Sequence, residues 1–249
     1  MPTYREVVPA PHLRSRVECF WLSNGPAVAT PQRVVPDGCA DIIYTRSESS
    51  SMLRFIGPMT RFQDFPQTPA SISLGIRFRP GMCNDFLQLS GAQAANTVLP
   101  LDALTPVQAA DLKRRLDDCD PPGEQLSICA SYLPPAPPLS PFHQAIAALE
   151  LSRGTVALDA LAAMSGLSTR QFRRKCLEHT ALSPKLLARI LRFRHAHIRL
   201  PLATTHAGLA LACGYFDQSH LIADFREFAG HTPKARTSPS LRPRSASVP

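Results

Sequence analysis

The feature that most constrains this chain is a proline-rich segment near its middle. Residues 133–141 read Leu-Pro-Pro-Ala-Pro-Pro-Leu-Ser-Pro, which puts five prolines in nine residues. Such a run cannot continue a helix or take an interior place in a sheet, because proline has no backbone N–H. It predicts a stiff, extended linker. We therefore expect two domains, at 1–132 and 142–236, and a disordered tail at 237–249 that is rich in Ser, Pro and Arg.

The part before the linker predicts short strands first and helices later. We expect strands at 17–22, 39–44, 52–56 and 72–78. In the last of them Ile72, Leu74, Ile76 and Phe78 alternate with other residues, so they share one face. After Gly81 the pattern turns helical, and Thr105 with Pro106 has the form of a helix start. The fold class predicted for the whole chain is α+β, with a β-rich first domain and an all-α second one.

The part after the linker predicts helices throughout, and one short pattern occurs twice in it. Gly166 marks a turn, after which Ser168 and Gln171 have the spacing of a capping box that opens a helix over 169–179. Gly214 marks the second turn, after which Asp217 opens another helix. A long helix over 185–200 joins the two patterns. The repeat predicts two helix-turn-helix units.

The joining helix has a length that suits DNA. About 16 residues span roughly 24 Å in an α-helix. With the turns added, the second helices of the two units can lie about 34 Å apart, which is one turn of the double helix. Both could then enter successive major grooves on one face of the DNA. A plain helical bundle with a basic surface is the alternative, but it does not account for the repeated spacing.

The net charge also differs between the two parts of the chain. Residues 1–140 hold 12 Lys and Arg against 13 Asp and Glu, a net charge of −1, whereas residues 141–249 hold 15 against 6, a net charge of +9. A basic unit attached to a neutral one suggests a polyanion binder. A solvated basic surface without a partner is the other interpretation of this excess.

The residues of the second part resemble the AraC-type DNA-binding domain over about 156–234. The matching pieces are Ser165-Gly-Leu-Ser168, Phe172-x-Arg174, Leu182-Ser-Pro184, Arg192-Phe193-x-x-Ala196, the stretch from Ala210 through Gly214-Tyr215-x-Asp217-Gln-Ser-His-Leu221, Phe225-Arg226 and Gly230-His-Thr-Pro233. The resemblance implies a sequence-specific transcription regulator that binds double-stranded DNA, often an activator that touches RNA polymerase.

The first part resembles a sensor family that accompanies AraC-type domains. The matching pieces are Val17-Glu-Cys-Phe-Trp21, Pro36-Asp-Gly-Cys-Ala-Asp41, Gly57-Pro58 and Arg77-Phe-Arg-Pro-Gly81. This resemblance implies a domain that receives a signal, such as a small-molecule effector. Within these pieces Asp37, Asp41, Arg77 and Arg79 are candidate effector-binding residues. The structural alternative places Asp37 in a turn and pairs an Asp with an Arg between strands.

The resemblance also assigns candidate DNA contacts. On the first recognition helix we expect base or phosphate contacts from Arg170, Arg173 and Arg174, with Lys175 beside them, because Arg can bind guanine with two hydrogen bonds. On the second, the groove-facing positions are Gln218, Ser219, His220 and Ile222, although His220 could instead bond to the backbone. Asp217 is expected to cap that helix. Candidate phosphate contacts are Lys185, Arg189 and Arg226.

Four residues depart from the AraC-type pattern. Ala181 stands where a helix-ending Gly is usual, so that turn would have to form without a left-handed position. Leu187 replaces a common Tyr, and Gly208 lies inside a short helix, at a cost of about 1 kcal/mol against Ala. Ala223 stands where Arg is usual on the second recognition helix, which predicts that the second unit holds DNA more weakly than the first.

Enzyme chemistry has little support in this sequence. It holds no Gly-x-Ser-x-Gly elbow, no His-rich metal motif and no Gly-rich phosphate loop, so an enzyme with Cys39 or Asp41 as catalyst is a weak alternative. The seven cysteines form no Cys-x-x-Cys pair and no zinc spacing, no run is apolar enough to span a membrane, and we expect no signal peptide. We expect a cytoplasmic, reduced protein without metal or cofactor and away from membranes, in which Cys39 is a buried thiol rather than a redox sensor. A non-specific architectural DNA binder is the other alternative.

Overall fold

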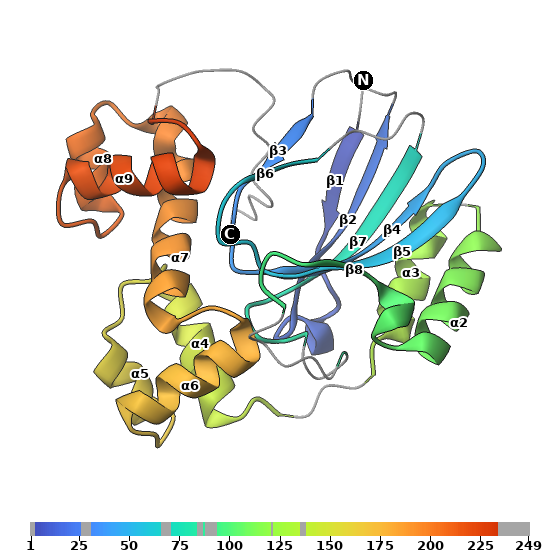
Figure 1. The fold of residues 1–249 in the computed structure, drawn as a ribbon, viewed down its shortest axis with the longest axis horizontal. Coiled ribbons are helices and arrows are strands. Elements are labelled where there is room, and N and C mark those ends of the chain that lie inside the picture. The colour runs from blue at the N-terminus through green and yellow to red at the C-terminus, as the bar shows by residue number, and fades with distance from the viewer. Residues whose placement is uncertain are drawn as a thin grey trace.

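The computed structural model describes residues 3–25, 31–65, 71–83, 87, 94–120, 122–134 and 138–233. A β-rich first half is followed by a helical second half, which confirms the α+β class predicted from the sequence (Figure 1). Residues 135–137 of the predicted linker and the predicted tail at 237–249 lie outside the described residues. Pro141, expected to end the linker, is already the first residue of a helix.

One antiparallel sheet forms the body of the first half. Its strands, in spatial order, are β1 (Thr3–Val7), β2 (Val17–Gly25), β7 (Ser71–Phe78), β4 (Ala40–Arg46), β5 (Ser51–Ile56) and β8 (Val98–Pro100). A second, two-stranded sheet pairs β3 (Gln32–Val34) with β6 (Gln63–Phe65). The four predicted strands correspond to β2, β4, β5 and β7. Strands β1, β3, β6 and β8 were not predicted, and β8 interrupts the helical pattern expected after Gly81.

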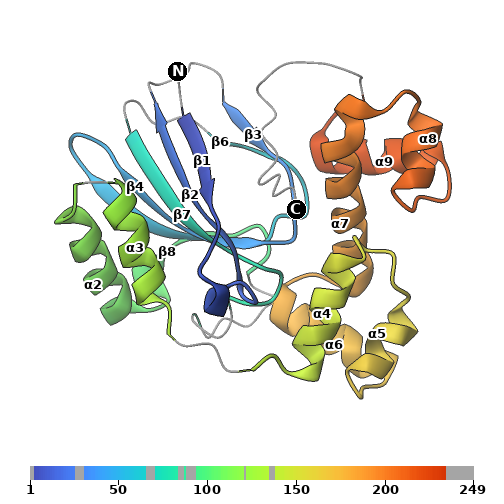
Figure 2. The same cartoon turned by 180° about the vertical axis from the view of Figure 1, so that it is seen from behind.

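The central strand β7 shows why one face of the large sheet is buried. Leu74, Ile76 and Phe78 alternate along it and are almost fully buried. They pack toward the helices α2 (Pro106–Asp117) and α3 (Pro122–Tyr132), which cover this face (Figure 2). On the opposite face Gly75 lies under the Trp21 indole, where an added Cβ would come within 2.3 Å of a ring atom. One face of β7 therefore belongs to the apolar core, and the other lies under the buried Trp21 side chain.

The second half contains six α-helices in the part that the structure describes. They are α4 (Pro141–Leu151), α5 (Leu158–Met164), α6 (Thr169–Thr180), α7 (Pro184–Arg199), α8 (His206–Ala212) and α9 (Gln218–Ala229). Short 3-10 turns occur in the first half at η1 (Pro11–Leu13) and η3 (Leu101–Ala103), and in the second half at η4 (Leu200–Leu202). The two helices predicted with bounds, 169–179 and 185–200, correspond to α6 and α7 and differ from them by at most one residue at either end, which is within the usual uncertainty of helix ends.

Short-range capping explains why the helices begin where they do. The hydroxyl groups of Ser140, Ser168 and Ser183, and the carboxylate of Asp217, each accept a hydrogen bond from the backbone N–H three residues on. Ser168 and Gln171 form the predicted capping box. Thr105 lies at the start of α2 as predicted, but its side chain makes no capping hydrogen bond.

The end of α6 corrects one expectation. Ala181 was expected to avoid the left-handed conformation, yet its φ is 60° and it forms a left-handed cap whose N–H donates to Leu177 O. A non-glycine residue pays roughly 1–2 kcal/mol for this conformation. The Ala181 methyl group is buried in the apolar core of the first half, which helps to offset the cost. Tertiary packing therefore overrides the local preference here.

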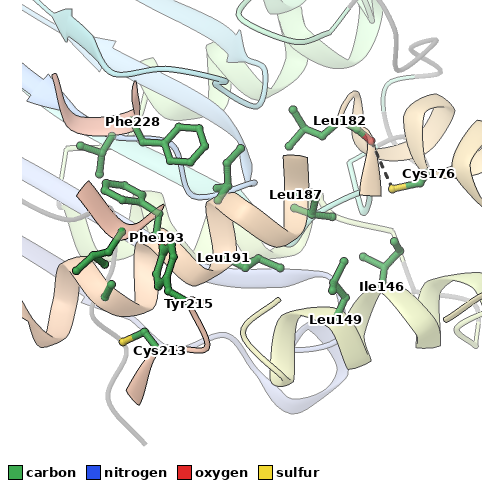
Figure 3. Close-up of a cluster of buried hydrophobic side chains, with 14 of the residues drawn as sticks. Ile146, Leu149, Cys176, Leu182, Leu187, Leu191, Phe193, Cys213, Tyr215 and Phe228 are labelled. Atoms are coloured by element: carbon green, nitrogen blue, oxygen red, sulfur yellow. Dashed lines mark hydrogen bonds between the residues drawn. The ribbon is translucent and has the colours of Figure 1, made fainter. Parts of the chain in front are cut away.

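One buried cluster joins the helices of the second half (Figure 3). Leu187, Leu191 and Phe193 of α7 lie within it, with Ile146 from α4 near one end and Phe228 from α9 near the other. The Phe193 and Phe228 rings lie 5.3 Å apart between centroids. The helix α7 contributes to both ends of this core. It therefore links the unit that contains α6 to the unit that contains α9, which lie at opposite ends of α7 (Figure 1).

Candidate nucleic-acid interface

The helix α6 presents a basic outer side. Phe172 and Cys176 anchor its inner side, and both are fully buried. Arg170, Arg173 and Arg174 are exposed on it. Arg174 lies 3.5 Å from Glu178, but the two side chains are 76% and 56% exposed, so this ion pair is weak. The three guanidinium groups are therefore accessible to a polyanion.

Lys175 lies on a different side of α6 from the arginines. It is half-buried, and its ammonium group lies 5.2 Å from the centroid of the Phe142 ring, within range of a cation–π contact. This contact ties Lys175 to α4 of the same unit.

The helix α9 presents a polar but nearly uncharged outer side. Gln218, Ser219 and His220 are exposed in its first turn, and Ile222 is half-buried. Asp217 accepts hydrogen bonds from the backbone N–H and ring Nδ1 of His220, both at 2.8 Å, and these hydrogen bonds lower the pKa of the Asp217 carboxyl. Asp217 thus occupies the capping position predicted for it.

Basic groups are sparse on α9 beyond its first turn. Ala223 is exposed, and Arg226 is exposed in the last turn. The exposed sides of α6 and α9 therefore differ in charge, as expected from Ala223 standing where Arg is usual.

Most basic side chains of α7 are occupied within the protein, although the sequence placed Arg189 among the phosphate contacts. Arg189 Nη2 lies 2.6 Å from Asp224 Oδ1 and 2.5 Å from Glu227 Oε2, and its guanidinium group lies over the Phe228 ring. Asp224 is buried. Lys185 remains exposed at the start of α7. This geometry gives Arg189 a different role: it fastens α9 to α7.

Two further arginines of α7 also bind within the chain. Arg192 donates to the carbonyl of Gly154 at 2.9 Å, which joins α7 to the turn that follows α4. Arg194 forms an ion pair with Glu18 of β2, 176 residues away in the sequence. Burial alone would raise the pKa of Glu18, but Arg194 and Arg77 lower it to about 2. No local sequence signal could have shown the Glu18–Arg194 pair, because its members meet only after the domains pack.

Three of the candidate effector residues meet in one buried cluster of the first domain. Arg77 Nε lies 3.3 Å from Asp41 Oδ1 and 3.8 Å from Asp37 Oδ2, and all three side chains are buried. Burial lowers the pKa of Arg77, but Asp41 and Asp37 raise it well above its usual value. Asp37 also accepts from the Cys39 N–H in a turn, and Asp41 accepts from Trp21 Nε1 at 2.9 Å. The geometry is that of an ion-paired turn and sheet.

Arg79 lies apart from this cluster. Its Nη1 atom lies 2.5 Å from Glu150 Oε1, so Arg79 joins the first domain to α4 of the second. Burial raises the pKa of the Glu150 carboxyl, and Arg79 lowers it in part. Arg79 is therefore a contact between domains.

The residues named for the enzyme alternative have unsuitable surroundings. Cys39 is fully buried, its thiol donates to Glu18 Oε2, and burial raises its pKa well above the usual value, the opposite of an activated nucleophile. Asp41 is fully buried between Trp21 and Arg77. Among the described residues, no group of His, Cys, Asp or Glu could hold a metal ion. Within the same part of the chain, every helix is too short or too polar to cross a membrane.

Comparisons with solved structures find matches at low identity and low TM-score. The DNA-binding domain of AdpA, a global transcriptional factor solved in complex with a target DNA, is 23% identical; the match covers 38% of this chain and 87% of that one, with a TM-score of 0.36. ToxT from Vibrio cholerae is 9% identical over 86% of this chain and 95% of that one, with a TM-score of 0.44. ToxT with a bound unsaturated fatty acid is 11% identical over 86% and 93%, with a TM-score of 0.42.

Two domain families match the chain itself, whereas no curated protein matches it. Residues 5–100 match a domain of unknown function, DUF6597, and residues 161–237 match a helix-turn-helix domain. The second match contains α6, α7 and α9, whose geometry is described above. The chain therefore carries an AraC-type helix-turn-helix domain at residues 161–237, preceded by a DUF6597 domain at residues 5–100.

Proposed function

We propose that this chain is a sequence-specific DNA-binding transcription regulator whose first domain passes a signal to the second. One observation carries the proposal: two exposed helices, α6 and α9, each follow a glycine turn and lie at opposite ends of one connecting helix. The second helix of a helix-turn-helix unit is the one that enters the major groove.

The proposed roles follow from exposure. Arg170, Arg173 and Arg174 on α6 read or clamp one half of the site, and Gln218, Ser219 and His220 on α9 contact the other half. Lys185 and Arg226 bind phosphate and position the protein without reading sequence.

We propose that the first domain changes DNA binding through its direct contacts with the second domain. Arg79 with Glu150, and Glu18 with Arg194, join the two domains. A small-molecule effector bound in the first domain, or RNA polymerase bound to either domain, could change DNA binding through these pairs. If Asp37, Asp41 and Arg77 hold the effector, it must compete with the ion pairs that they already form.

A test is to select duplexes from random DNA with the full-length protein and then compare the selected site with a scrambled duplex. We expect the selected site to bind at least about 10³-fold more tightly at physiological salt. We expect Lys185→Ala to weaken both duplexes and to reduce the log–log salt slope by about one phosphate equivalent, near 0.9. Arg114→Ala, an exposed charge on α2, is the control and should leave both affinities unchanged. Equal binding of all duplexes would favour the architectural alternative.

A second prediction separates positioning from phosphate binding at Arg189. If Arg189 fastens α9, Asp224→Asn and Arg189→Gln should each weaken binding several-fold and reduce footprint protection over one half of the site. The reason is that removing one partner of a buried ion pair leaves the other charge buried without compensation. This costs more free energy than the intact pair contributes. If Arg189 instead bound phosphate, Asp224→Asn would remove a negative charge and strengthen binding. Glu178→Gln, which removes an acid from α6, is the matched control.

A further inference from the structure

The first domain contacts the C-terminal end of the first recognition helix. Gly81, with a φ of +76°, lies so close to the end of α6 that an added Cβ would come 3.1 Å from Thr180 Cγ2. Ala181, the residue that ends α6, buries its methyl group in the core of the first domain. Arg79, two residues before Gly81, holds Glu150 of α4 in the same unit. The first unit is therefore held at the far end of its recognition helix, away from the exposed first turn.

The first domain also contacts the C-terminal end of the second recognition helix. Arg33 Nη1 donates to the carbonyl oxygen of Ala229 at 3.4 Å, where the helix dipole favours a cation. The Phe62 ring lies against Gly230, where an added Cβ would come within 2.6 Å of the ring. Asp64 binds Arg33 through two hydrogen bonds of 2.7 and 2.8 Å, and Arg33 stacks 4.2 Å from the Phe62 centroid. These groups come from β3, β6 and the segment before β6.

A third contact lies between these two, on the connecting helix. Glu18 pairs with Arg194, and Gly38 approaches Leu187 so closely that an added Cβ would come 2.8 Å from its Cδ1 atom. Val35 of the first domain belongs to the apolar core of the helical half. Figures 1 and 2 both show the two units at opposite ends of α7, with the sheets of the first domain on one side of them.

These three contacts have a consequence for the distance between the recognition helices. Each unit packs on α7, so without another contact the separation of α6 and α9 would depend on one helix and its two end junctions. The first domain instead holds the far end of each recognition helix and the helix between them. We infer that the DUF6597 domain fixes the separation and angle of α6 and α9, and so determines which half-site spacing the protein can read. The inference rests on the proposed function.

Half-site spacing is sensitive to small changes in this geometry. One inserted base pair moves a half-site by roughly 3.4 Å and turns it by about 35° around the DNA axis. Two rigidly held recognition helices cannot follow that change, whereas two units joined through α7 alone can adjust. Arg33 and Arg79 are then residues that determine spacing specificity without touching DNA. Their side chains are about one-third exposed, so replacing them leaves the cores intact.

The test uses full-length protein and a selected site, together with the same site carrying one base pair inserted or deleted between its halves. For the unmodified protein we expect at least about a tenfold loss of affinity from either change, since a whole half-site is displaced. For Arg33→Ala combined with Arg79→Ala, the loss should fall below about threefold. Asp64→Asn, which loosens Arg33 without removing it, should give an intermediate loss. The matched control is Arg46→Ala, which breaks a pair with Asp120 inside the first domain and should keep the full penalty.

The outcomes separate the two proposals. If the double variant keeps the same spacing penalty as the unmodified protein, the inference is overturned. If the unmodified protein selects no DNA site at all, the proposed function fails instead. Thermal unfolding by circular dichroism checks that each variant is folded, and Arg33→Ala alone provides the same comparison should the double variant not fold. A spacing penalty that falls in Arg33→Ala and stays unchanged in Arg46→Ala supports the inference.

Discussion

Replacing Gly154 by alanine is expected to lower the free energy of unfolding of the helical domain by about 3 kcal/mol. Gly154 has a φ of +79°, so alanine would adopt a left-handed conformation there at a cost of roughly 1–2 kcal/mol. The added Cβ would also lie 2.1 Å from the carbonyl oxygen of Ala188, which belongs to the backbone of α7. A backbone atom inside a helix cannot turn away as a flexible side chain can, so the turn after α4 must move off α7.

The same movement should break a second contact. Arg192 donates to the Gly154 carbonyl, and this hydrogen bond joins the first unit to α7. We therefore expect Gly154→Ala to weaken DNA binding as well as stability. Urea unfolding followed by circular dichroism at 222 nm measures the first effect, and a binding titration on a selected duplex measures the second.

Gly166→Ala is the matched control for this prediction. Gly166 also has a positive φ, +65°, but an added Cβ would meet no atom within 4 Å. Its replacement should cost only the conformational part, about 1 kcal/mol. The difference between the two variants then isolates the close approach of Gly154 to α7. Equal losses in the two variants would show that this approach is not what requires glycine.

The second large effect is a loss of DNA affinity, expected from a substitution on α6. Arg174→Ala should weaken binding to the selected site at least about tenfold, because loss of an Arg–guanine contact costs about 1–3 kcal/mol. The Arg174 side chain is 76% exposed on the outer side of α6, and only a weak pair with Glu178 competes for it. The loss of base preference should be confined to one half of the site. Affinity measured on a set of single-base variants of the site shows which half is relaxed.

A comparable substitution on α9 should weaken DNA binding less. His220→Ala removes a ring whose Nδ1 atom already lies on Asp217, so we expect a smaller loss, restricted to the other half of the site. Ala223 is exposed where AraC-type domains usually carry Arg, and Ala223→Arg should tighten binding and add about 0.9 to the salt slope. Glu178→Gln is the control on α6, since it frees Arg174 without removing it.

The predicted difference in DNA binding between the two units would be contradicted by the following results. If Arg174→Ala and His220→Ala weaken binding equally, and Ala223→Arg brings no gain, then α9 is a full reader of its half-site. Single-base variants of the site would in that case show relaxed positions in both halves.

The sequence alone determined those parts of the fold that depend on near neighbours in the chain. The capping box of Ser168 and Gln171 involves residues three apart, and the starts of α4 and α7 depend on a Ser-Pro pair. The alternation in β7 needs only the two-residue period of a strand. The duplicated helix-turn-helix pattern and the charge difference are likewise properties of local spacing and composition, and together with the resemblance to AraC-type domains they led to the proposal of DNA binding.

Only the tertiary structure decided which charged groups remain available. Arg174 and Arg189 are equivalent in sequence as basic residues on helices, yet one is exposed and the other binds Asp224 and Glu227. Ala181 takes a left-handed conformation because a core from the other half of the chain accepts its methyl group. Glu18 and Arg194 meet across 176 residues. Local rules describe what a backbone segment prefers, whereas the partner of a side chain depends on how separate elements pack, and that is a property of the whole fold.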